Sequence, residues 1–388
     1  MRRWLLPEYI EDVLPAEARR VELLRRRLLD LFHACGYQYV IPPLLEYVES
    51  LTTGVGHDLD LLTFKVVDQL SGRLMGVRSD ITPQAARIDA HLLNQQGVTR
   101  LCYAGSVLRT QPGGTAQTRQ PLQLGAELFG HVGIESDLEI QRLLVQALRL
   151  AGVEKPHLDF SHVAIFRALV VRAGIDAALE SEMFCALQAK DASALSEMTA
   201  GLDKATREAL LALPALYGGA GVLQEAQQRL PQYAEIKQAL LELKRVEQVL
   251  AGLDVVVSFD LAELRGYHYH SGMVFAAYAE GYVGALALGG RYDEVGQAFG
   301  RSRPATGFSL DMRALIGMLP PAACSGAILA PYAEDAALQG QIDALRHAGE
   351  VVVVDLPGHE AHRPELQCDR MLVKKGESWE LVPADRQG

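Results

Sequence analysis

The first element that the hydrophobic pattern predicts is an amphipathic helix from Glu17 to Cys35. Apolar residues recur there every three or four positions, the spacing that places them on one helix face. The members of this stripe are Val21, Leu24, Leu28, Leu31, Phe32 and Cys35. Gly36 follows, and glycine readily takes the left-handed conformation that ends a helix. A strand is then predicted at 37–41, and the proline pair at 42–43 stops it.

Between about residues 62 and 130, short apolar runs alternate with turns, which predicts strands. The expected strands are Thr63 to Val67, Leu74 to Val77, Arg100 to Ala104 and Gln123 to Phe129. Thr82 and Pro83 predict a helix start, with Thr82 as the N-cap and Pro83 at the first helical position. That helix should run through Leu93, and another is expected from Ser136 to Ala151.

The second half of the chain predicts a helical segment, a return to strands, and a small separate region. The stretch from Phe166 to about Leu253 is mainly helical and is interpreted as an insertion. Strands are expected at Asp254 to Asp260, Met273 to Tyr278 and near Val283 to Leu288, and helices at Tyr292 to Phe299 and Asp311 to Met318. After a proline-containing linker at 320–325, we expect a strand (327–330), a helix (335–347), a strand (351–355) and a hairpin around Gly376. The predicted domains are therefore 1–320, with its insertion at about 166–253, and 326–388.

Length and composition indicate a globular protein of the cytoplasm. The chain has 388 residues, of which 49% are hydrophobic and 22% are charged, and that length predicts two or three domains. The formal net charge of −11 argues against a large nucleic-acid surface. No uncharged apolar run approaches the roughly 20 residues of a membrane helix. Pro7 and several acidic residues follow Leu6 at once, so we expect no signal peptide.

The familiar catalytic and metal motifs are absent from this sequence. There is no G-x-x-x-x-G-K-[ST], no G-x-G-x-x-G that opens a helix, no H-E-x-x-H and no G-x-S-x-G. His359 and His362 stand close together, but glycine and prolines surround them, so we interpret the pair as a solvated loop. The five scattered cysteines predict neither disulfides nor a zinc site and favour a reducing compartment. We expect no metal and no cofactor.

Three polar segments concentrate the side chains that could carry chemistry. They are Val77 to Thr82, Gly105 to Gly130, and Leu264 to His270 with Gly289 to Asp293 after it. In the second segment, Gln123, Gly125 and Glu127 share one face of a strand. Buried glutamine and glutamate cost free energy unless both find partners. Two interpretations stay open: a polar ligand pocket, or an internal salt-bridge network such as Glu127 with Arg265.

The order and spacing of these segments resemble the class II aminoacyl-tRNA synthetase core, and specifically histidyl-tRNA synthetases. The resemblance runs from about Leu14 to Leu319. The Pro43 region is similar to motif 1, which forms the dimer interface in that family, and Gly105 to Gly130 is similar to motif 2 with its loop. Arg265-Gly266-x-x-Tyr269 resembles the histidine-specific segment. Gly289 to Asp293 and Thr306-Gly307-Phe308 resemble the run into motif 3. The resemblance implies an α+β fold: an antiparallel sheet flanked by helices, with a helical insertion and a small C-terminal α/β region.

The half of the site that would bind ATP departs from the family pattern. Gln111 stands where synthetases have a glutamate, Gln117 where they have an arginine, and Pro121 where an aromatic residue stacks on adenine. Motif 3 normally ends Gly-Leu-Glu-Arg, and this chain has Asp311-Met312-Arg313-Ala314. Ala314 thus replaces an arginine that neutralises phosphates, and the loss of one such group costs about 2.7–4 kcal/mol. The resemblance therefore implies that aminoacyl activation is lost.

The half of the site that would bind an amino acid matches the family, with two exceptions. By resemblance, Asp80, Thr82 and Gln123 hold the α-amino group, Arg109 and Arg265 face the α-carboxylate, and Glu127, Tyr269 and His270 surround the imidazole. A carboxylate suits an ammonium group, guanidinium suits a carboxylate, and acceptors suit ring N–H groups. Asp80 is shorter than the family's glutamate, and His270 replaces a second tyrosine.

A synthetase-like chain without ATP chemistry resembles the family of ATP phosphoribosyltransferase regulatory subunits. The stretch after Ser325 is also shorter than the anticodon-binding domain of the synthetases. The resemblance implies a non-catalytic regulatory subunit in the first step of histidine biosynthesis, with L-histidine as the inhibitor. It further implies a homodimer through Glu17 to Pro43, assembled with the short catalytic subunit as a hetero-octamer, and no tRNA. The alternatives are a divergent histidyl-tRNA synthetase or another amino-acid-activating ligase, and a sensor of tRNA-like structures, which the acidic balance disfavours.

Overall fold

The computed structural model describes residues 4–52, 57–113, 117–319 and 326–384. The chain divides into two compact units, Met1–Leu319 and Pro320–Gly388. The linker expected at 320–325 lies outside the described residues. Within the described ranges, no helix is long and apolar enough to cross a membrane.

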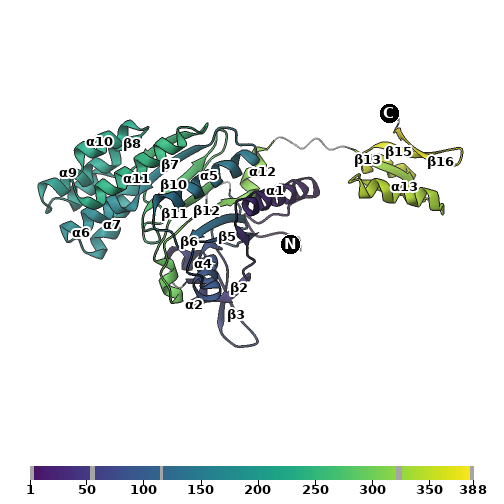
Figure 1. The fold of residues 1–388 in the computed structure, drawn as a ribbon. Helices are drawn as coiled ribbons and strands as arrows, with labels where there is room; N and C mark the ends of the chain where they lie inside the picture. The colour runs from purple at the N-terminus through teal and green to yellow at the C-terminus, as the bar shows by residue number, and fades with distance from the viewer. Residues whose placement is uncertain (1–3, 53–56, 114–116, 320–325, 385–388) are drawn as a thin grey trace. The chain divides into compact units, whose positions relative to one another are not determined.

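A nine-stranded sheet forms the centre of the first unit (Figure 1). Its strand order is β1-β5-β6-β12-β11-β10-β7-β9-β8. The β1–β5 and β7–β9 pairs are parallel, and the other neighbours are antiparallel. The strand bounds are β1 Gln38–Tyr39, β5 Thr99–Ser106, β6 Leu122–Phe129, β7 His157–His162, β8 Tyr217–Gly218, β9 Val256–Asp260, β10 Met273–Tyr278, β11 Ala287–Arg291 and β12 Ala305–Asp311. With its flanking helices, this is the α+β architecture expected from the sequence.

Helices cover one face of this sheet and leave the other for a site. Leu124, Ala126 and Leu128 of β6 belong to the same buried cluster as Leu28 and Phe32, which lie on the helix predicted from the early apolar stripe. The helices of this layer are α1 Pro15–Ala34, α5 Ile134–Leu150 and α12 Met312–Met318. Because successive strand residues point to opposite faces, the alternate residues of β6 point away from these helices.

A smaller three-stranded sheet, of order β2-β4-β3, lies beside the main sheet. Its elements and the short helices near it are β2 Leu45–Tyr47, α2 Val48–Thr52, α3 His57–Leu62, β3 Phe64–Val67, β4 Leu74–Val77, α4 Thr82–Arg87 and the π-helix η1 Ile88–Leu93. The prediction that Thr82 caps its helix was wrong by one position, because Ile81 is the N-cap. The carboxylate of Asp80 instead accepts the Thr82 N–H at 2.9 Å, which frees the Thr82 hydroxyl for a contact elsewhere.

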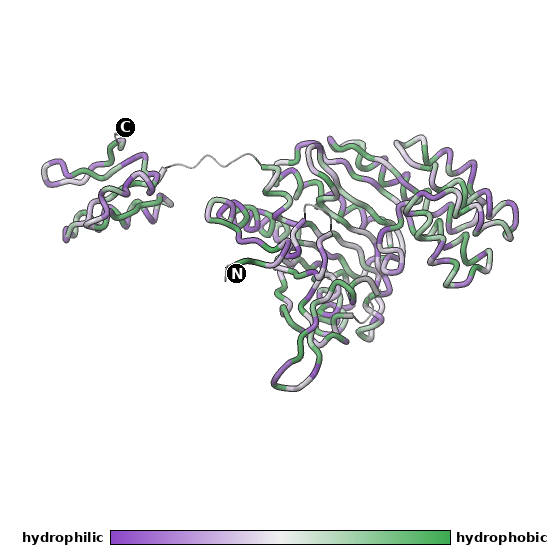
Figure 2. The backbone as a smooth tube through the Cα atoms, turned by 180° about the vertical axis from the view of Figure 1, so that it is seen from behind, coloured by the Kyte–Doolittle hydropathy of each residue, from purple (hydrophilic) through white to green (hydrophobic). Residues whose placement is uncertain are grey.

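The predicted helical insertion gathers at one end of the sheet (Figure 1). Its elements are α6 Val163–Ala173, α7 Ala177–Gln188, α8 Ala192–Met198, α9 Lys204–Ala212, the 3-10 turn η2 Leu213–Ala215, α10 Gly221–Arg229 and α11 Ala234–Leu250. Asp176, Asp191 and Asp203 cap α7, α8 and α9 by accepting backbone N–H groups. Hydrophilic and hydrophobic stretches alternate along these helices (Figure 2), as expected where each helix buries one face.

Two strands next to the site differ from the sequence prediction. The strand expected near Val283 to Leu288 begins four residues later as β11, and β12 was not predicted at all. The helix expected at 292–299 is the shorter 3-10 helix η3 Val295–Phe299. Gly289, Gly290 and Gly307 occupy these strands, and glycine is depleted in strands because it offers no side chain to pack. The sequence pattern that predicts a strand is therefore weak at these glycines, where the sheet lacks side chains.

The second unit is a four-stranded sheet of order β14-β13-β15-β16 with one helix against it. Its elements are β13 Ala327–Pro331, α13 Ala336–His347, β14 Val352–Asp355, the 3-10 helix η4 Glu360–Leu366, β15 Cys368–Lys375 and β16 Ser378–Pro383. Leu338 and Ile342 of α13 pack on Ile328 and Val352. His362 contacts Glu365 at 2.9 Å, and the described residues hold no cluster of three or more metal-ligating side chains.

Candidate functional site

A cavity of about 230 Å³ lies over the centre of the large sheet. Strand register builds its floor, because Glu127 of β6 is opposite Gly307 of β12, and Gly307 is opposite Gly290 of β11. Neighbouring strands are roughly 4.8 Å apart, so the two glycines form a bare strip beside the glutamate. A Cβ atom at Gly307 would clash with the Glu127 carboxylate. Gly290 and Gly307, which weaken the sequence signal for β11 and β12, thus also leave the space for the cavity.

The structure brings the residues proposed from the sequence together. Seven of the eight line this cavity: Asp80, Thr82, Arg109, Glu127, Arg265, Tyr269 and His270. The eighth, Gln123, lines the adjoining cavity, and its Nε2 donates to Asp80 at 2.7 Å. These residues come from three separate stretches of the chain, which the sheet and its loops place side by side.

Glu127 is fully buried and is held by two tyrosines. Tyr103 donates to one carboxylate oxygen at 2.9 Å, and Tyr292 donates to the other. Burial raises the pKa of Glu127 to about 8, against the opposing effect of these hydrogen bonds. Burial also raises the pKa values of both tyrosines well above the usual value, so both hydroxyls keep their protons and act as donors.

The internal salt bridge between Glu127 and Arg265, left open from the sequence, is not present. Arg265 Nη2 instead lies 3.3 Å from Glu263, at the exposed mouth of the cavity. Arg109 Nε makes a weak contact with the Ser79 carbonyl at 3.4 Å. Two guanidinium groups therefore reach the cavity: Arg265 is paired with Glu263, which also lines the cavity, and Arg109 contacts a backbone carbonyl.

Asp80 and Gln123 form a fixed polar corner at the other side of the cavity. Gln123 Oε1 accepts the Ile81 N–H at 2.9 Å, and its amide nitrogen donates to Asp80. Both ends of the Gln123 amide are therefore satisfied, which orients the Asp80 carboxylate. This answers the question raised by a buried glutamine on a strand face.

His270 and Tyr269 form one wall of the cavity. His270 Nδ1 lies 3.2 Å from the Arg291 carbonyl, so Nδ1 carries the proton and Nε2 is the acceptor. Burial lowers the pKa of His270 to about 4, so the ring is neutral at neutral pH. The Tyr269 hydroxyl is buried, and within the described part of the chain it has no hydrogen-bond partner. An unpaired buried hydroxyl in a cavity indicates a place where a polar ligand atom belongs.

The helical insertion holds the loop that carries these two residues. Arg167 of α6 donates to the His270 carbonyl at 3.0 Å, and Tyr267 donates to Glu180 of α7 at 2.6 Å. Tyr267 also packs edge-on against Phe166. The insertion, to which the sequence assigned no chemistry, thus positions one wall of the site.

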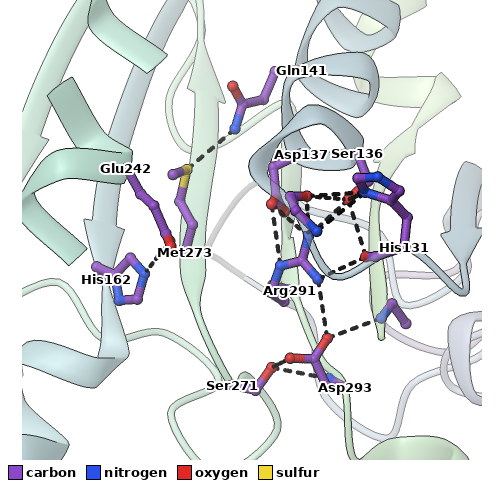
Figure 3. A network of polar contacts seen from close by, with 12 residues as sticks. His131, Ser136, Asp137, Gln141, His162, Glu242, Ser271, Met273, Arg291 and Asp293 are labelled. Atoms are coloured by element: carbon purple, nitrogen blue, oxygen red, sulfur yellow. Dashed lines mark hydrogen bonds and ion pairs between the residues drawn. The ribbon is translucent and has the colours of Figure 1, made fainter. Parts of the chain in front are cut away.

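A buried ion network anchors the β11 end of the site. Figure 3 shows the Arg291 guanidinium among Asp137, Ser136, His131 and Asp293. Arg291 Nη2 lies 2.6 Å from Asp137 and 2.8 Å from Ser136. The Arg291 carbonyl holds His270, and the next residue, Tyr292, reaches Glu127. The network therefore fixes two groups that touch the cavity.

Tyr103 and Tyr292 are the functional residues that sequence reasoning missed. Tyr292 lines the cavity, and Tyr103 lies behind it with no exposed surface. Sequence spacing does not reveal them, because Tyr103 comes to the same face as Glu127 only through the pairing of β5 with β6, where it is opposite Gly125.

A second cavity, of about 450 Å³, adjoins the first. It is lined by Arg109, Gln117, Pro121, Arg265, Asp311 and Ala314, among others. Asp311 lines this cavity, and backbone N–H groups hold its carboxylate. Asp311 Oδ1 accepts the N–H groups of Arg313 and Leu122 at 3.0 and 3.2 Å, so the carboxylate caps α12 and ties it to β6. Burial raises its pKa.

Comparison with known proteins agrees with this geometry. The family model for histidyl-tRNA synthetase matches residues 9–315, and the model for the ATP phosphoribosyltransferase subunit HisZ C-terminal domain matches residues 325–382. A solved structure from Bacillus halodurans C, described as an ATP phosphoribosyltransferase regulatory subunit/histidyl-tRNA synthetase, superimposes with a TM-score of 0.82. It is 26% identical, over 94% of this chain and 96% of that one. The fold and the cavity thus define a class II, histidyl-tRNA synthetase-like protein.

Curated relatives narrow this class further. The ATP phosphoribosyltransferase regulatory subunit of Methylobacillus flagellatus is 62% identical over 384 residues, which is 99% of each chain. That of Nitrosospira multiformis is 56% identical over 389 residues, again 99% of each chain. The chain belongs to the family of ATP phosphoribosyltransferase regulatory subunits. The recognition made from motif order and spacing is confirmed.

Proposed function

We propose that this regulatory subunit senses L-histidine in the cavity over the large sheet and catalyses no reaction itself. One observation carries the proposal: complementary groups for every part of an amino acid surround one cavity, while Ala314 and a capping Asp311 line the nucleotide side. Binding of L-histidine next to a cavity in which Ala314 replaces a phosphate-neutralising arginine suits sensing better than activation.

Each part of L-histidine finds a partner of opposite polarity in this site. The α-ammonium group meets the acceptor oxygens of Asp80 and Thr82 and the dipole of the Gln123 side-chain amide. Arg109 and Arg265 are placed for the α-carboxylate, which a guanidinium binds through charge-assisted hydrogen bonds. Glu127, the unpaired Tyr269 hydroxyl and His270 Nε2 are left for the imidazole nitrogens.

The partners follow from the same assignment. A sensor without chemistry requires a catalytic subunit, and we propose the short catalytic subunit of ATP phosphoribosyltransferase in a cytoplasmic hetero-octamer without tRNA. Histidine binding then inhibits that subunit by favouring an inactive arrangement of the complex. We further propose a homodimer through Glu17 to Pro43, supported by exposed Tyr39 and Ile41 at the end of this segment. Sedimentation of the chain at micromolar concentration tests the dimer, and a monomer contradicts it.

Binding and exchange assays on the purified chain test the assignment to sensing. Calorimetry should detect L-histidine binding without ATP, because the amino-acid contacts do not depend on a nucleotide. Histidine-dependent exchange of labelled pyrophosphate into ATP should stay at background, because the cation that Ala314 replaces is missing. Exchange above background would favour the alternative of an amino-acid-activating ligase.

Histidine affinity should be highest between about pH 6.5 and 8. Glu127 keeps its proton up to a pKa of about 8, and a free imidazole keeps one up to roughly 6.5. The bound pair holds one proton between carboxylate and ring. Below pH 6.5 the unbound Glu127 and the free imidazole each carry a titratable proton, two in all. Binding then releases one proton, so the histidine affinity falls as pH falls. Above pH 8 the unbound Glu127 and the free imidazole carry no titratable proton. Binding then takes up one proton, so the histidine affinity falls as pH rises.

Calorimetric titration between pH 5.5 and 9 checks this profile. Glu127→Gln is the matched control, because it keeps the shape of the side chain and removes its titration. The amino group of the ligand titrates equally with both proteins, so the difference between them isolates Glu127. The variant should lack the Glu127 contribution to the high-pH decline. Superimposable profiles would show that Glu127 does not share a proton with the ligand.

A further inference from the structure

A hydrogen-bonded series of two hydroxyl groups and a carboxylate joins the two ends of the proposed histidine site. Thr82 Oγ1 lies 2.9 Å from the Tyr103 hydroxyl, and that hydroxyl donates to Glu127 at 2.9 Å. Thr82 stands beside Asp80 at the ammonium end, and Glu127 stands at the imidazole end. Tyr103 has no exposed surface, and burial keeps its hydroxyl protonated. The contact between the two ends is therefore shielded from water.

This hydrogen-bonded series can run in two directions, because either oxygen of the Thr82–Tyr103 pair can donate. With Glu127 ionised, Tyr103 donates to Glu127 and Thr82 donates to Tyr103. With Glu127 protonated, the carboxyl can donate to Tyr103, which then donates to Thr82. The protonation of Glu127 and the direction of the Thr82 hydroxyl are thus linked.

An α-ammonium group at Asp80 and Thr82 favours the first order. It donates to Thr82 Oγ1, and that oxygen offers both lone pairs only when its own proton points to Tyr103. Hydrogen bonds in a buried chain polarise one another. A cation at one end therefore stabilises the carboxylate at the other end, where the imidazole is received.

We infer that Tyr103 is a positioning residue that makes imidazole recognition depend on recognition of the α-ammonium group. The inference rests on the proposed histidine-binding function and deepens it. It narrows the ligand class to an imidazole that carries an α-ammonium group. A related imidazole acid without the amino group loses the direct contacts of that group and, in addition, the coupling through Tyr103.

Two ligands on three proteins test the coupling. The ligands are L-histidine and 3-(imidazol-4-yl)propanoate, which keeps the ring and the carboxylate and lacks the amino group. The proteins are the wild type, Tyr103→Phe and Tyr292→Phe. The measured quantity for each protein is the dissociation constant of 3-(imidazol-4-yl)propanoate divided by that of L-histidine. Tyr292→Phe is the matched control, because it also removes one donor from Glu127 but leaves the Thr82–Tyr103 hydrogen bond in place.

The ratio should fall at least fivefold in Tyr103→Phe, the lower end of typical couplings between sites. In Tyr292→Phe both ligands should bind more weakly, with the ratio unchanged. An unchanged ratio in Tyr103→Phe, or an equal fall in Tyr292→Phe, overturns the inference. Wild-type protein that binds neither ligand contradicts the proposed function itself, so the two failures are distinct.

The wild type alone supplies a second measurement if Tyr103→Phe does not fold. Glycine and 4-methylimidazole together carry nearly all the groups of histidine as two separate molecules. Saturating glycine should tighten the binding of 4-methylimidazole, followed by NMR titration, because its ammonium group favours an ionised Glu127. Equal affinity with and without glycine contradicts the coupling.

Discussion

Replacing Arg109 with alanine should weaken L-histidine binding by roughly 30- to 5,000-fold. The range corresponds to about 2–5 kcal/mol for truncating one partner of a hydrogen-bonded charge pair. Arg109 Nε makes a contact of 3.4 Å with the Ser79 carbonyl, which a carboxylate can displace. Removal of the guanidinium therefore leaves the ligand carboxylate desolvated without its main counter-charge. Isothermal calorimetry with the folded variant measures the loss.

Arg172→Ala is the control for this variant. Arg172 pairs with Glu235 on the exposed surface of the insertion, with both side chains about half exposed, and such pairs contribute about 0–1 kcal/mol. Its histidine affinity should equal that of the wild type. If Arg109→Ala, with an unchanged melting temperature, also binds histidine like the wild type, then the carboxylate binds elsewhere and the assignment of the cavity is wrong.

Replacing Arg291 with methionine should lower the free energy of unfolding by about 3–5 kcal/mol, the usual cost of leaving a buried charge without its partner. Arg291 is 8% exposed and Asp137 is 3% exposed, and their atoms lie 2.6 Å apart. Methionine fills much of the space but leaves the Asp137 carboxylate unpaired, and burial already raises the pKa of that group. Denaturant unfolding of the full chain, followed by circular dichroism, measures the change.

The double variant Arg291→Met with Asp137→Leu separates charge from packing. Removing both charges of a buried pair is often nearly neutral, so the double variant should recover much of the lost stability. A loss below about 1 kcal/mol in Arg291→Met would contradict the role of this network. A double variant no more stable than the single one would show that the loss comes from packing rather than from the stranded carboxylate.

The parts of the fold that could be predicted from sequence are those with strong local patterns. The stripe of α1, the alternation of β6 and the apolar run of β10 each predict an element with bounds close to those observed. β12 could not be predicted in this way, although it lies between β6 and β11 at the centre of the sheet. Its Gly307 is required by the approach of Glu127, and this requirement comes from a strand distant in the sequence.

The candidate site shows the same division. Glu127 stood out because a carboxylate on a buried strand face is costly, but its partners could not be found from spacing. Tyr292 directly follows β11 and Tyr103 lies on β5, and only the sheet order places both beside Glu127. The role of Asp311 could not be predicted for a similar reason. Its role as a cap depends on the backbone N–H groups of Arg313 and Leu122, which become neighbours only in the folded chain.

Inhibition of the reconstituted complex by L-histidine is the direct test of histidine sensing in this cavity. The chain is mixed with the short catalytic subunit, and phosphoribosyl transfer is followed as L-histidine is added. Wild-type complex should be inhibited, and the complex with Glu127→Gln should assemble and turn over but require more histidine for half-inhibition. A complex that histidine does not inhibit, or a Glu127→Gln complex with wild-type sensitivity, would contradict the claim that this cavity is the sensor.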